Sequence, residues 1–326
     1  MNIIETNNLT KKFNGLTAVD TLNLQIKEGE IFGLLGPNGA GKTTTLLMLT
    51  TLQAPTSGTA TINNYDIRTQ SHNVRKSIGI VFQDPSSDEI LTGYENLKLH
   101  GWLYDMPDNL REERIKEVLE LVDLATRKDD RVKKYSGGMR RRLELARGLM
   151  HHPKVLFLDE PTLGLDPQTR GSIWEYIQKL AKEKKITIVM TTHYMDEADK
   201  LCDRLAIIDH GKIVVLGSPK ELKKELGGDI IRLKSTKPNI SKLKKLPYVK
   251  KISRCNDEIC LTIENANTHL QELLNFVGKV DSAEIHSPTL DDVFIHYTGR
   301  KIRESTPEGS WADKAMHANL QGGTRR

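Results

Sequence analysis

The sequence predicts an α/β protein in which a parallel or mixed sheet carries a helical insertion and is followed by a small α+β domain. Three observations support this fold class. Short, almost continuously apolar runs alternate with helical patterns up to about residue 227, as strands buried on both faces do. Between residue 84 and about residue 150 the chain becomes charged and helical. Gly227-Gly228 then breaks the pattern before a second set of short strands.

The first domain, residues 1–227, takes its strands from the apolar runs. These runs are Ile31–Leu35, Ile78–Phe82, Val155–Leu158, Ile186–Thr191, Leu205–Ile208 and Ile213–Leu216. The helical insertion, about 84–150, is most regular at REERIKEVLELVDLA. There the apolar residues Ile115, Val118, Leu119 and Val122 recur on one helix face.

The second domain, residues 228–300, is predicted to be a small accessory or regulatory α+β unit. It has strand-like runs at Ile230–Leu233, Ile259–Ile263 and Ala283–His286, and a helical pattern at His269–Val277. Residues 301–326 are polar and lack periodicity, which predicts a flexible tail.

Composition excludes some classes of protein. The 326 residues carry 48 Lys or Arg and 43 Asp or Glu, a net charge of +5. Residues 220–260 hold twelve basic against five acidic residues, so the rest of the chain sums to about −2, and no nucleic-acid partner is expected. No apolar run approaches the ~20 residues of a membrane-spanning helix. The N-terminus lacks an apolar secretion signal, and three cysteines without metal spacing indicate reduced thiols in the cytosol.

The strongest motif is Gly36-Pro-Asn-Gly-Ala-Gly-Lys42-Thr43, the P-loop pattern GxxxxGK[ST], between a predicted strand and a predicted helix (Thr44–Thr51). Its glycines let backbone N–H groups converge on phosphates, and the helix N-terminus adds partial positive charge. Lys42 would meet the β- and γ-phosphates, and the Thr43 hydroxyl would meet Mg²⁺. The expected nucleotide contacts in this segment are Gly36, Asn38, Gly39, Gly41, Lys42, Thr43 and Thr44. Nucleotide kinases, GTPases and motor ATPases all share this loop, so it leaves the class open.

Two adjacent acidic residues narrow the choice among these classes of P-loop protein. Asp159 and Glu160 follow the buried run Val155–Leu158, and parallel sheets bind ligands at the carboxyl ends of their strands. Asp159 is expected in the Mg²⁺ shell. Glu160 is expected to act as the general base that polarises an attacking water.

A second anion cradle is predicted at Ser136-Gly137-Gly138, where a helix begins. That helix, MRRRLELARGLM, is expected to bury Met139 and three later apolar residues and to expose Arg140, Arg141 and Arg142. Two phosphate cradles in one chain suggest that they serve different ATP molecules, with two copies of the chain meeting head to tail.

In this fixed order the motifs resemble those of the ATP-binding subunit of ABC transporters, over about residues 1–220. The resemblance implies the P-loop ABC-ATPase sandwich with an α-helical subdomain. It also assigns further residues: Phe13 stacking on adenine, the Q-loop Gln83 contacting Mg²⁺ and water, the D-loop Gly164-Leu165-Asp166, and His193 after Thr192. Two departures leave phosphate binding intact: Met139 stands where the common signature LSGGQ has glutamine, and Phe13 replaces the usual tyrosine.

The resemblance also implies a mechanism. ATP on the P-loop of one subunit is completed by Ser136 and Gly138 of a second copy, so two ATPs hold a homodimer together and hydrolysis releases it. His193 contacts the γ-phosphate and, with Glu160, the attacking water. Asp166 lies at the dimer seam, or else is a simple turn residue before Pro167.

Partners are implied in the same way. The ending SPTLDDVFIHYTGR (Ser287–Arg300) is similar to that of ATPases in the drug-resistance branch, the daunorubicin/doxorubicin-exporter type. The chain would then energise export of a drug, lipid or other hydrophobic cargo by an integral membrane permease on a separate chain. Its place would be the cytoplasmic face of the membrane, with Asp84–Gly101 either touching the permease or forming an exposed loop. The alternatives are a soluble ABC ATPase acting on ribosomes or nucleic acid, and a small-molecule kinase.

Overall fold

The computed structural model describes residues 1–234, 243, 246–255, 258–264, 266–277 and 280–299. The predicted tail, 301–326, and part of the basic stretch 220–260 lie outside these residues. The described chain divides into two compact units, Met1–Val214 and the chain from Val215 onward. This division lies upstream of the Gly227-Gly228 break.

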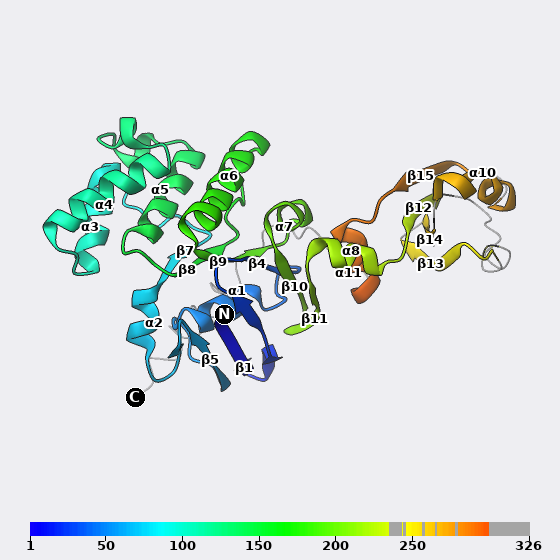
Figure 1. Ribbon diagram of the computed structural model, residues 1–326, viewed down its shortest axis with the longest axis horizontal. Helices are drawn as coiled ribbons and strands as arrows, with labels where there is room; N and C mark the ends of the chain where they lie inside the picture. Colours follow the sequence, from blue (N-terminus) through cyan, green and yellow to red (C-terminus); the bar gives the residue numbers. More distant parts are fainter. Residues whose placement is uncertain (235–242, 244–245, 256–257, 265, 278–279, 300–326) are drawn as a thin grey trace. The chain divides into compact units, whose positions relative to one another are not determined.

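A six-stranded sheet forms the centre of the first unit (Figure 1), and each of the six predicted apolar runs is one of its strands. The strands are β4 (Ile31–Leu35), β7 (Ile78–Val81), β8 (Val155–Asp159), β9 (Thr187–Thr192), β10 (Arg204–Asp209) and β11 (Lys212–Gly217). Their order is β11-β10-β4-β9-β8-β7, and the five strands from β10 to β7 pair in parallel. Every residue of β4, β8 and β9 is buried, which explains the apolar runs 31–35, 155–158 and 188–190 within them.

A second, antiparallel sheet was not predicted. It consists of β1 (Asn2–Phe13), β2 (Leu16–Leu22), β3 (Gln25–Lys27), β5 (Ser57–Ile62) and β6 (Tyr65–Asp66). The long strand β1 carries register shifts against β2, β3 and β5, and Asn8 within it has a φ of 47°. Each irregularity moves the following side chains to the other face, so the alternation that marks a strand is lost from the sequence. The single mixed sheet that the sequence allowed is therefore two sheets.

The main core of the first unit lies between these two sheets. Helix α1 (Lys42–Leu49) contacts β2 of the antiparallel sheet and β8 and β9 of the parallel sheet. Apolar side chains from both sheets and from α1, among them Ile4, Phe32, Leu46 and Phe157, belong to one buried cluster. The segment that follows the P-loop is thus held on two sides, which fixes the loop itself.

The predicted helical insertion is confirmed. It contains α3 (Gly93–Leu103), α4 (Asp108–Leu121) and α5 (Gly137–Leu149), with short 3-10 turns at Ala125–Arg127 and Val132–Lys134. The three helices contact one another, and α5 also packs on β7 (Figure 1). The remaining helices of this unit are α2 (Ser71–Ser77), α6 (Pro167–Lys184) and α7 (Met195–Leu201). Among the described residues, no helix has the length and apolarity needed to span a bilayer.

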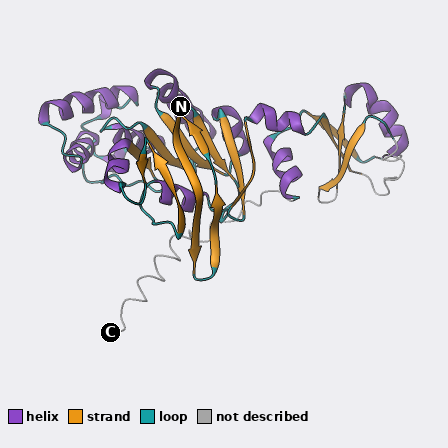
Figure 2. Ribbon diagram, turned by 60° about the horizontal axis from the view of Figure 1, so that its bottom comes forward, coloured by secondary structure: helices purple, strands orange, loops and turns teal. Residues whose placement is uncertain are grey.

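The second unit has a sheet and a core of its own. Its antiparallel sheet has the order β13-β14-β12-β15, and α10 packs on β12. Figure 2 shows helices beside the strands of this unit. The described elements are α8 (Pro219–Glu225), β12 (Asp229–Lys234), β13 (Val249–Cys255), β14 (Glu258–Ile263), α10 (Ala266–Val277), β15 (Ser282–His286) and α11 (Leu290–Thr298). The three predicted strands and the predicted helix are present, whereas β13 and α11 were not predicted. Ile231, Leu261 and Leu273 belong to its buried apolar cluster.

Candidate functional site

The candidate site lies at the carboxyl edge of the parallel sheet. The P-loop follows β4, His193 follows β9, Asp159 ends β8, and Gln83 comes two residues after β7. These four strands are consecutive neighbours in the sheet. Residues that are far apart in the sequence therefore meet at one edge, where parallel sheets bind ligands.

The P-loop backbone needs its glycines. A Cβ on Gly36 would lie 2.3 Å from the carbonyl oxygen of Ile208, and one on Gly41 would lie 2.4 Å from the carbonyl oxygen of Ala18. Gly41, the N-cap of α1, also has a φ of 105°, which side-chain-bearing residues rarely adopt. The loop can bring its N–H groups close to a phosphate only because these Cβ atoms are absent.

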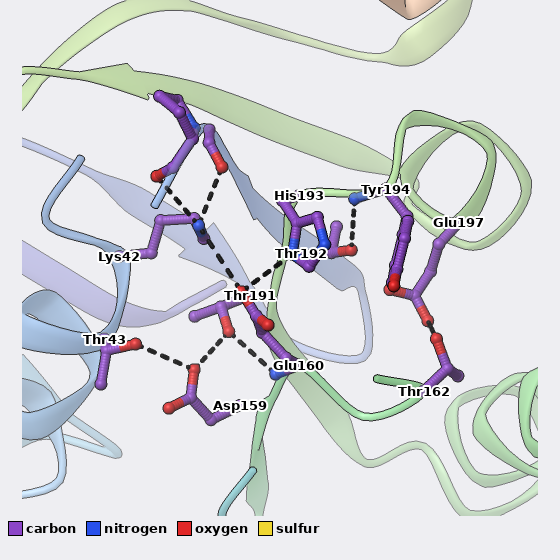
Figure 3. Close-up of polar contacts among 12 residues, drawn as sticks. Lys42, Thr43, Asp159, Glu160, Thr162, Thr191, Thr192, His193, Tyr194 and Glu197 are labelled. Atoms are coloured by element: carbon purple, nitrogen blue, oxygen red, sulfur yellow. Dashed lines mark hydrogen bonds and ion pairs between the residues drawn. The ribbon is translucent and has the colours of Figure 1, made fainter. Parts of the chain in front are cut away.

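Lys42 is buried at the first position of α1. Its Nζ donates to the carbonyl oxygens of Gly36 (2.8 Å) and Pro37 (3.2 Å) and forms an ion pair with Glu160 Oε1 at 3.7 Å (Figure 3). Burial lowers the pKa of Lys42, although the charges of Glu160 and Asp159 oppose the shift. The ammonium is thus desolvated and held by weak acceptors, which suits a group that must bind a triphosphate.

The Asp159 carboxylate accepts hydrogen bonds from two hydroxyl groups. Thr43 Oγ1 donates to Asp159 Oδ1 at 3.2 Å, and Thr191 Oγ1 donates to the same oxygen (Figure 3). The carboxyl group is 4% exposed, and burial together with the charge of Glu160 raises its pKa despite the two donors. A carboxylate and a threonine hydroxyl in contact are hard oxygen ligands, the kind that Mg²⁺ prefers.

Glu160 faces His193. The distance from His193 Nδ1 to Glu160 Oε1 is 3.1 Å, and the backbone N–H of Glu160 donates to Thr191 Oγ1 at 3.0 Å (Figure 3). Burial by itself would raise the pKa of Glu160, but the hydrogen bond from His193 and the charge of Lys42 outweigh it and lower the pKa. Glu160 also has a φ of 44°, a left-handed conformation that is uncommon for a side-chain-bearing residue and clusters at functional sites. It is therefore a carboxylate at neutral pH, as a general base must be.

The second predicted cradle starts α5. The Ser136 side chain accepts from the N–H of Met139 at 3.3 Å, and Ser136 and Gly137 are both exposed. A Cβ on Gly138 would lie 2.5 Å from Thr169 Cγ2, so this glycine permits the close approach of α5 and α6. Asp166 is the N-cap of α6: its carboxylate accepts from the N–H of Thr169 at 3.0 Å and from its hydroxyl at 2.6 Å. The signature cradle and the D-loop thus lie side by side on the surface.

The other predicted contact residues lie on β1, in the P-loop, on α1 and in the loop after β7. Phe13 ends β1, is half-buried, and has Lys11 Nζ at 5.0 Å from its ring centroid. Asn38 and Gly39 are exposed in the P-loop, and Thr44 is half-buried on α1. Gln83 is exposed in the loop after β7.

The prediction that the signature helix exposes its three arginines is wrong, most clearly for Arg141. Arg140 and Arg142 are half-buried, but Arg141 is only 6% exposed. Its guanidinium donates to backbone carbonyls at the ends of β7 and β8. Met139, expected in the core, is half-buried. Helical periodicity assigns an arginine to solvent by residue type, and it contains no information about carbonyls supplied from other strands.

Sequence reasoning also missed a buried carboxyl group behind His193. Glu197 on α7 is fully buried and accepts from the Thr162 hydroxyl (2.7 Å) and from the Trp174 indole N–H (3.0 Å) (Figure 3). Burial raises its pKa, against the effect of these donors. The sequence signal that could have revealed Glu197 is its place four residues after His193, in the segment that forms α7 and buries this side chain.

Comparisons with known proteins agree with this geometry. The model of the ABC transporter family matches residues 19–163, and that of the DrrA1-3-like ATP-binding protein C-terminal domain matches 217–298. The chain is 38% identical to the daunorubicin/doxorubicin resistance ATP-binding protein DrrA of Streptomyces peucetius, over 95% of this chain and 97% of that protein. It is 35% identical to the linearmycin resistance ATP-binding protein LnrL of Bacillus subtilis, over 93% and 100%.

Solved structures give the same picture. One is cbiO1 of Clostridium perfringens, part of the ABC transporter complex cbiONQ, with a TM-score of 0.65, 32% identity, and coverage of 69% of this chain and 91% of that one. Another is the ATP-binding cassette MJ0796 in a dimeric post-hydrolysis state with ADP and Pi. It has a TM-score of 0.60, 29% identity, and coverage of 66% and 98%. The predicted family and fold are thereby confirmed. This chain belongs to the ATP-binding proteins of ABC transporters, in the DrrA-type branch, and is an ATPase.

Proposed function

We propose that this chain works as a homodimer in which each ATP lies between the P-loop of one copy and the Ser136-Gly137-Gly138 cradle of the other. The exposure of Ser136 and Gly137 at the N-terminus of α5 supports this arrangement, because their side chain and backbone N–H groups are accessible to a phosphate. The D-loop Asp166 beside this cradle would then lie at the seam between the copies. The similar cassette MJ0796 forms a dimer in its post-hydrolysis state with ADP and Pi.

The nucleotide-binding residues divide the contacts with ATP and its metal ion among them in this proposal. Lys42 Nζ exchanges the carbonyls of Gly36 and Pro37 for the β- and γ-phosphate oxygens, which are charged and stronger acceptors. Thr43, Asp159 and Gln83 would hold Mg²⁺, and the first two already meet through a hydrogen bond. The ion would supply positive charge that neutralises the phosphates during transfer. Phe13 would stack its ring on adenine.

Hydrolysis is assigned to Glu160 and His193. A water oxygen attacks the γ-phosphorus, the bond to the bridging oxygen of ADP breaks, and the water proton passes to the Glu160 carboxylate. Because this carboxylate can only accept, Nδ1 of His193 carries the proton in their 3.1 Å contact. His193 thus orients Glu160 and keeps it ionised.

We further propose that an integral membrane permease, on a separate chain, docks on the helical insertion. Apolar side chains stand out there: Ile90 is 72% exposed, Trp102 54% and Leu103 71%. They lie within or just after Asp84–Gly101, and exposed apolar patches of this kind mark interaction sites. The chain would then sit peripherally on the cytoplasmic face of the membrane. The relatives are proteins of drug and linearmycin resistance, which supports export of a drug, lipid or other hydrophobic cargo.

The second unit is proposed as an accessory domain that regulates the ATPase or stabilises the dimer. Its separate sheet and core support this assignment, because the phosphate-binding residues all belong to the first unit. The family model for a DrrA-like C-terminal domain matches the same part of the chain.

The observation that carries the proposal is the Glu160 carboxylate held between His193 Nδ1 and Lys42 Nζ beside the Thr43–Asp159 pair. Co-purification tests the transport assignment. The tagged chain should bring down a polytopic protein from detergent-solubilised membranes, and replacing Trp102 and Leu103 by Ser should abolish this while ATP binding stays unchanged. Recovery of ribosomes or nucleic acid in place of a polytopic protein would contradict the transport assignment.

A further inference from the structure

Arg141 combines a buried charge with backbone contacts at the ends of two different strands, β7 and β8. The residue lies on α5, one turn after the signature cradle, and its side chain is only 6% exposed. Burial lowers its pKa to about 10, with the carboxylates of Glu144 and Asp159 acting in the opposite direction. Arg141 is therefore still a cation at neutral pH. A buried cation is costly unless it is fully hydrogen-bonded, so its contacts define its role.

The guanidinium spreads its N–H groups over five carbonyl oxygens. Nε donates to Pro161 at 2.6 Å, and Nη2 donates to Asp159 at 3.1 Å and to Glu160 at 3.2 Å. Nη1 donates to the carbonyls of Phe82 and Gln83. A guanidinium is planar and presents its donors in a fixed fork, so these carbonyls are held in one mutual geometry.

These carbonyls belong to the residues on which hydrolysis depends. Gln83 follows β7, whereas Asp159 and Glu160 come from the end of β8. The ladder between β7 and β8 ends at Val81 and Leu158, so beyond those residues the two segments are not joined by sheet pairing. Arg141 bridges them just past that point.

We propose that Arg141 is a positioning residue for ATP hydrolysis: it holds the Gln83 and Glu160 segments in register and ties both to the signature helix. The inference rests on the proposed function. Because Ser136 and Arg141 are on the same helix, about 7 Å apart along its axis, a shift of the signature cradle moves the guanidinium with it. The helix that would bind the nucleotide of the other copy therefore also sets the geometry of the catalytic carboxylate of its own chain.

The neighbouring Arg142 provides a matched control. It lies on the same helix and also donates to backbone carbonyls, those of Val122 and Asp123, both at 3.1 Å. These carbonyls belong to the helical insertion and not to the nucleotide site. Replacing Arg142 thus removes backbone hydrogen bonds from α5, together with its contacts to the Asp123 carboxylate and the Tyr176 hydroxyl, without touching the segments that carry Gln83 and Glu160.

The test compares Arg141→Gln, Arg141→Lys and Arg142→Gln in the full chain. For each, nucleotide stoichiometry and Kd are measured with a fluorescent ATP analogue, and kcat and KM by phosphate release, normalised to bound nucleotide. Arg141→Gln should keep Kd within about threefold and lower kcat by roughly 10- to 100-fold, because charge-assisted hydrogen bonds are lost and a small displacement of the base is costly. Arg142→Gln should keep kcat within about threefold.

Arg141→Lys is the second variant, and it keeps the test decisive if Arg141→Gln fails to fold. Its ammonium keeps the charge but cannot span five carbonyls, so we expect an intact nucleotide stoichiometry and a kcat several-fold below wild type. Wild-type kcat in Arg141→Gln, full activity in Arg141→Lys, or equal losses in Arg141→Gln and Arg142→Gln would each overturn the inference. A wild-type protein without turnover would instead overturn the proposed function and, with it, this inference.

Discussion

His193→Ala is the substitution that most directly probes how the catalytic carboxylate is kept ionised. The change removes the 3.1 Å hydrogen bond from Nδ1 to Glu160 Oε1. Both side chains are largely buried, at 16% and 10% exposure, so solvent replaces this contact poorly. A hydrogen bond to a charged group contributes about 1.5–3 kcal/mol, which corresponds to a loss of roughly 10- to 150-fold in kcat if the contact persists in the transition state.

The same substitution has a predicted effect on pH dependence. The His193 hydrogen bond is among the interactions that lower the pKa of Glu160 against the effect of burial. Without it the pKa rises, so a higher pH is needed to ionise the base, and the acidic limb of the kcat profile moves to higher pH. Lys42 still contributes its charge, so the limb moves without disappearing.

The assay is initial-rate phosphate release from ATP between about pH 3.5 and 9, at saturating nucleotide, so that the range extends below the ordinary pKa of a glutamate. His72→Ala is the control, because its side chain is exposed on α2. A kcat of His193→Ala within threefold of wild type, or an acidic limb at the wild-type pH, would refute this reasoning. A matching loss in His72→Ala would do the same.

Two further predictions concern other charged groups. Lys42→Ala should raise the Kd for ATP by at least about 100-fold in a fluorescence titration, because the buried ammonium is the cation placed for the phosphates. An unchanged Kd would show that Lys42 does not bind the nucleotide. The Glu117 carboxylate accepts hydrogen bonds from Lys184 and Arg114. Burial alone would raise the pKa of Glu117, but these two cations outweigh it and lower the pKa from 4.5 to about 2. Its contribution to stability is therefore present above pH 4.5 and is lost as the pH falls towards 2. Because its side chain is 39% exposed, Glu117→Gln should cost under ~1 kcal/mol in urea unfolding at pH 7 and less at pH 3, and a cost that grows at pH 3 would contradict the sign.

The parallel half of the fold could be predicted because a strand that is buried on both faces has a simple apolar sequence pattern. Strands β4, β8 and β9 are buried throughout, so each contains a short apolar run, which threonines flank in β9 and Asp159 ends in β8. The strands of the antiparallel sheet have no such sequence pattern. Strand β1 holds polar residues, and its irregular register moves side chains from one face to the other. Periodicity detects a strand only while its pairing is regular.

The candidate site could be predicted as a set of residues, but not its supporting contacts. Lys42, Asp159, Glu160 and His193 stand in motifs whose spacing reflects their chemistry, and the structure brings their side chains together. Arg141 was misassigned because its role depends on carbonyl groups that any residue type would provide.

The buried network behind the site escaped prediction for a related reason. Glu197 meets Thr162 and Trp174, which lie 35 and 23 residues away along the chain. Only the tertiary fold brings these side chains into contact.

The central claim is that two copies of this chain share two ATPs and that Glu160 is the base that ends this state. Static light scattering of the Glu160→Gln protein, with and without saturating Mg²⁺ and ATP, tests it most directly. The protein should bind ATP, shift from monomer to dimer, and release phosphate at least about 10²-fold more slowly than wild type. A protein that binds ATP but remains monomeric, or one that hydrolyses ATP at the wild-type rate, would contradict the account.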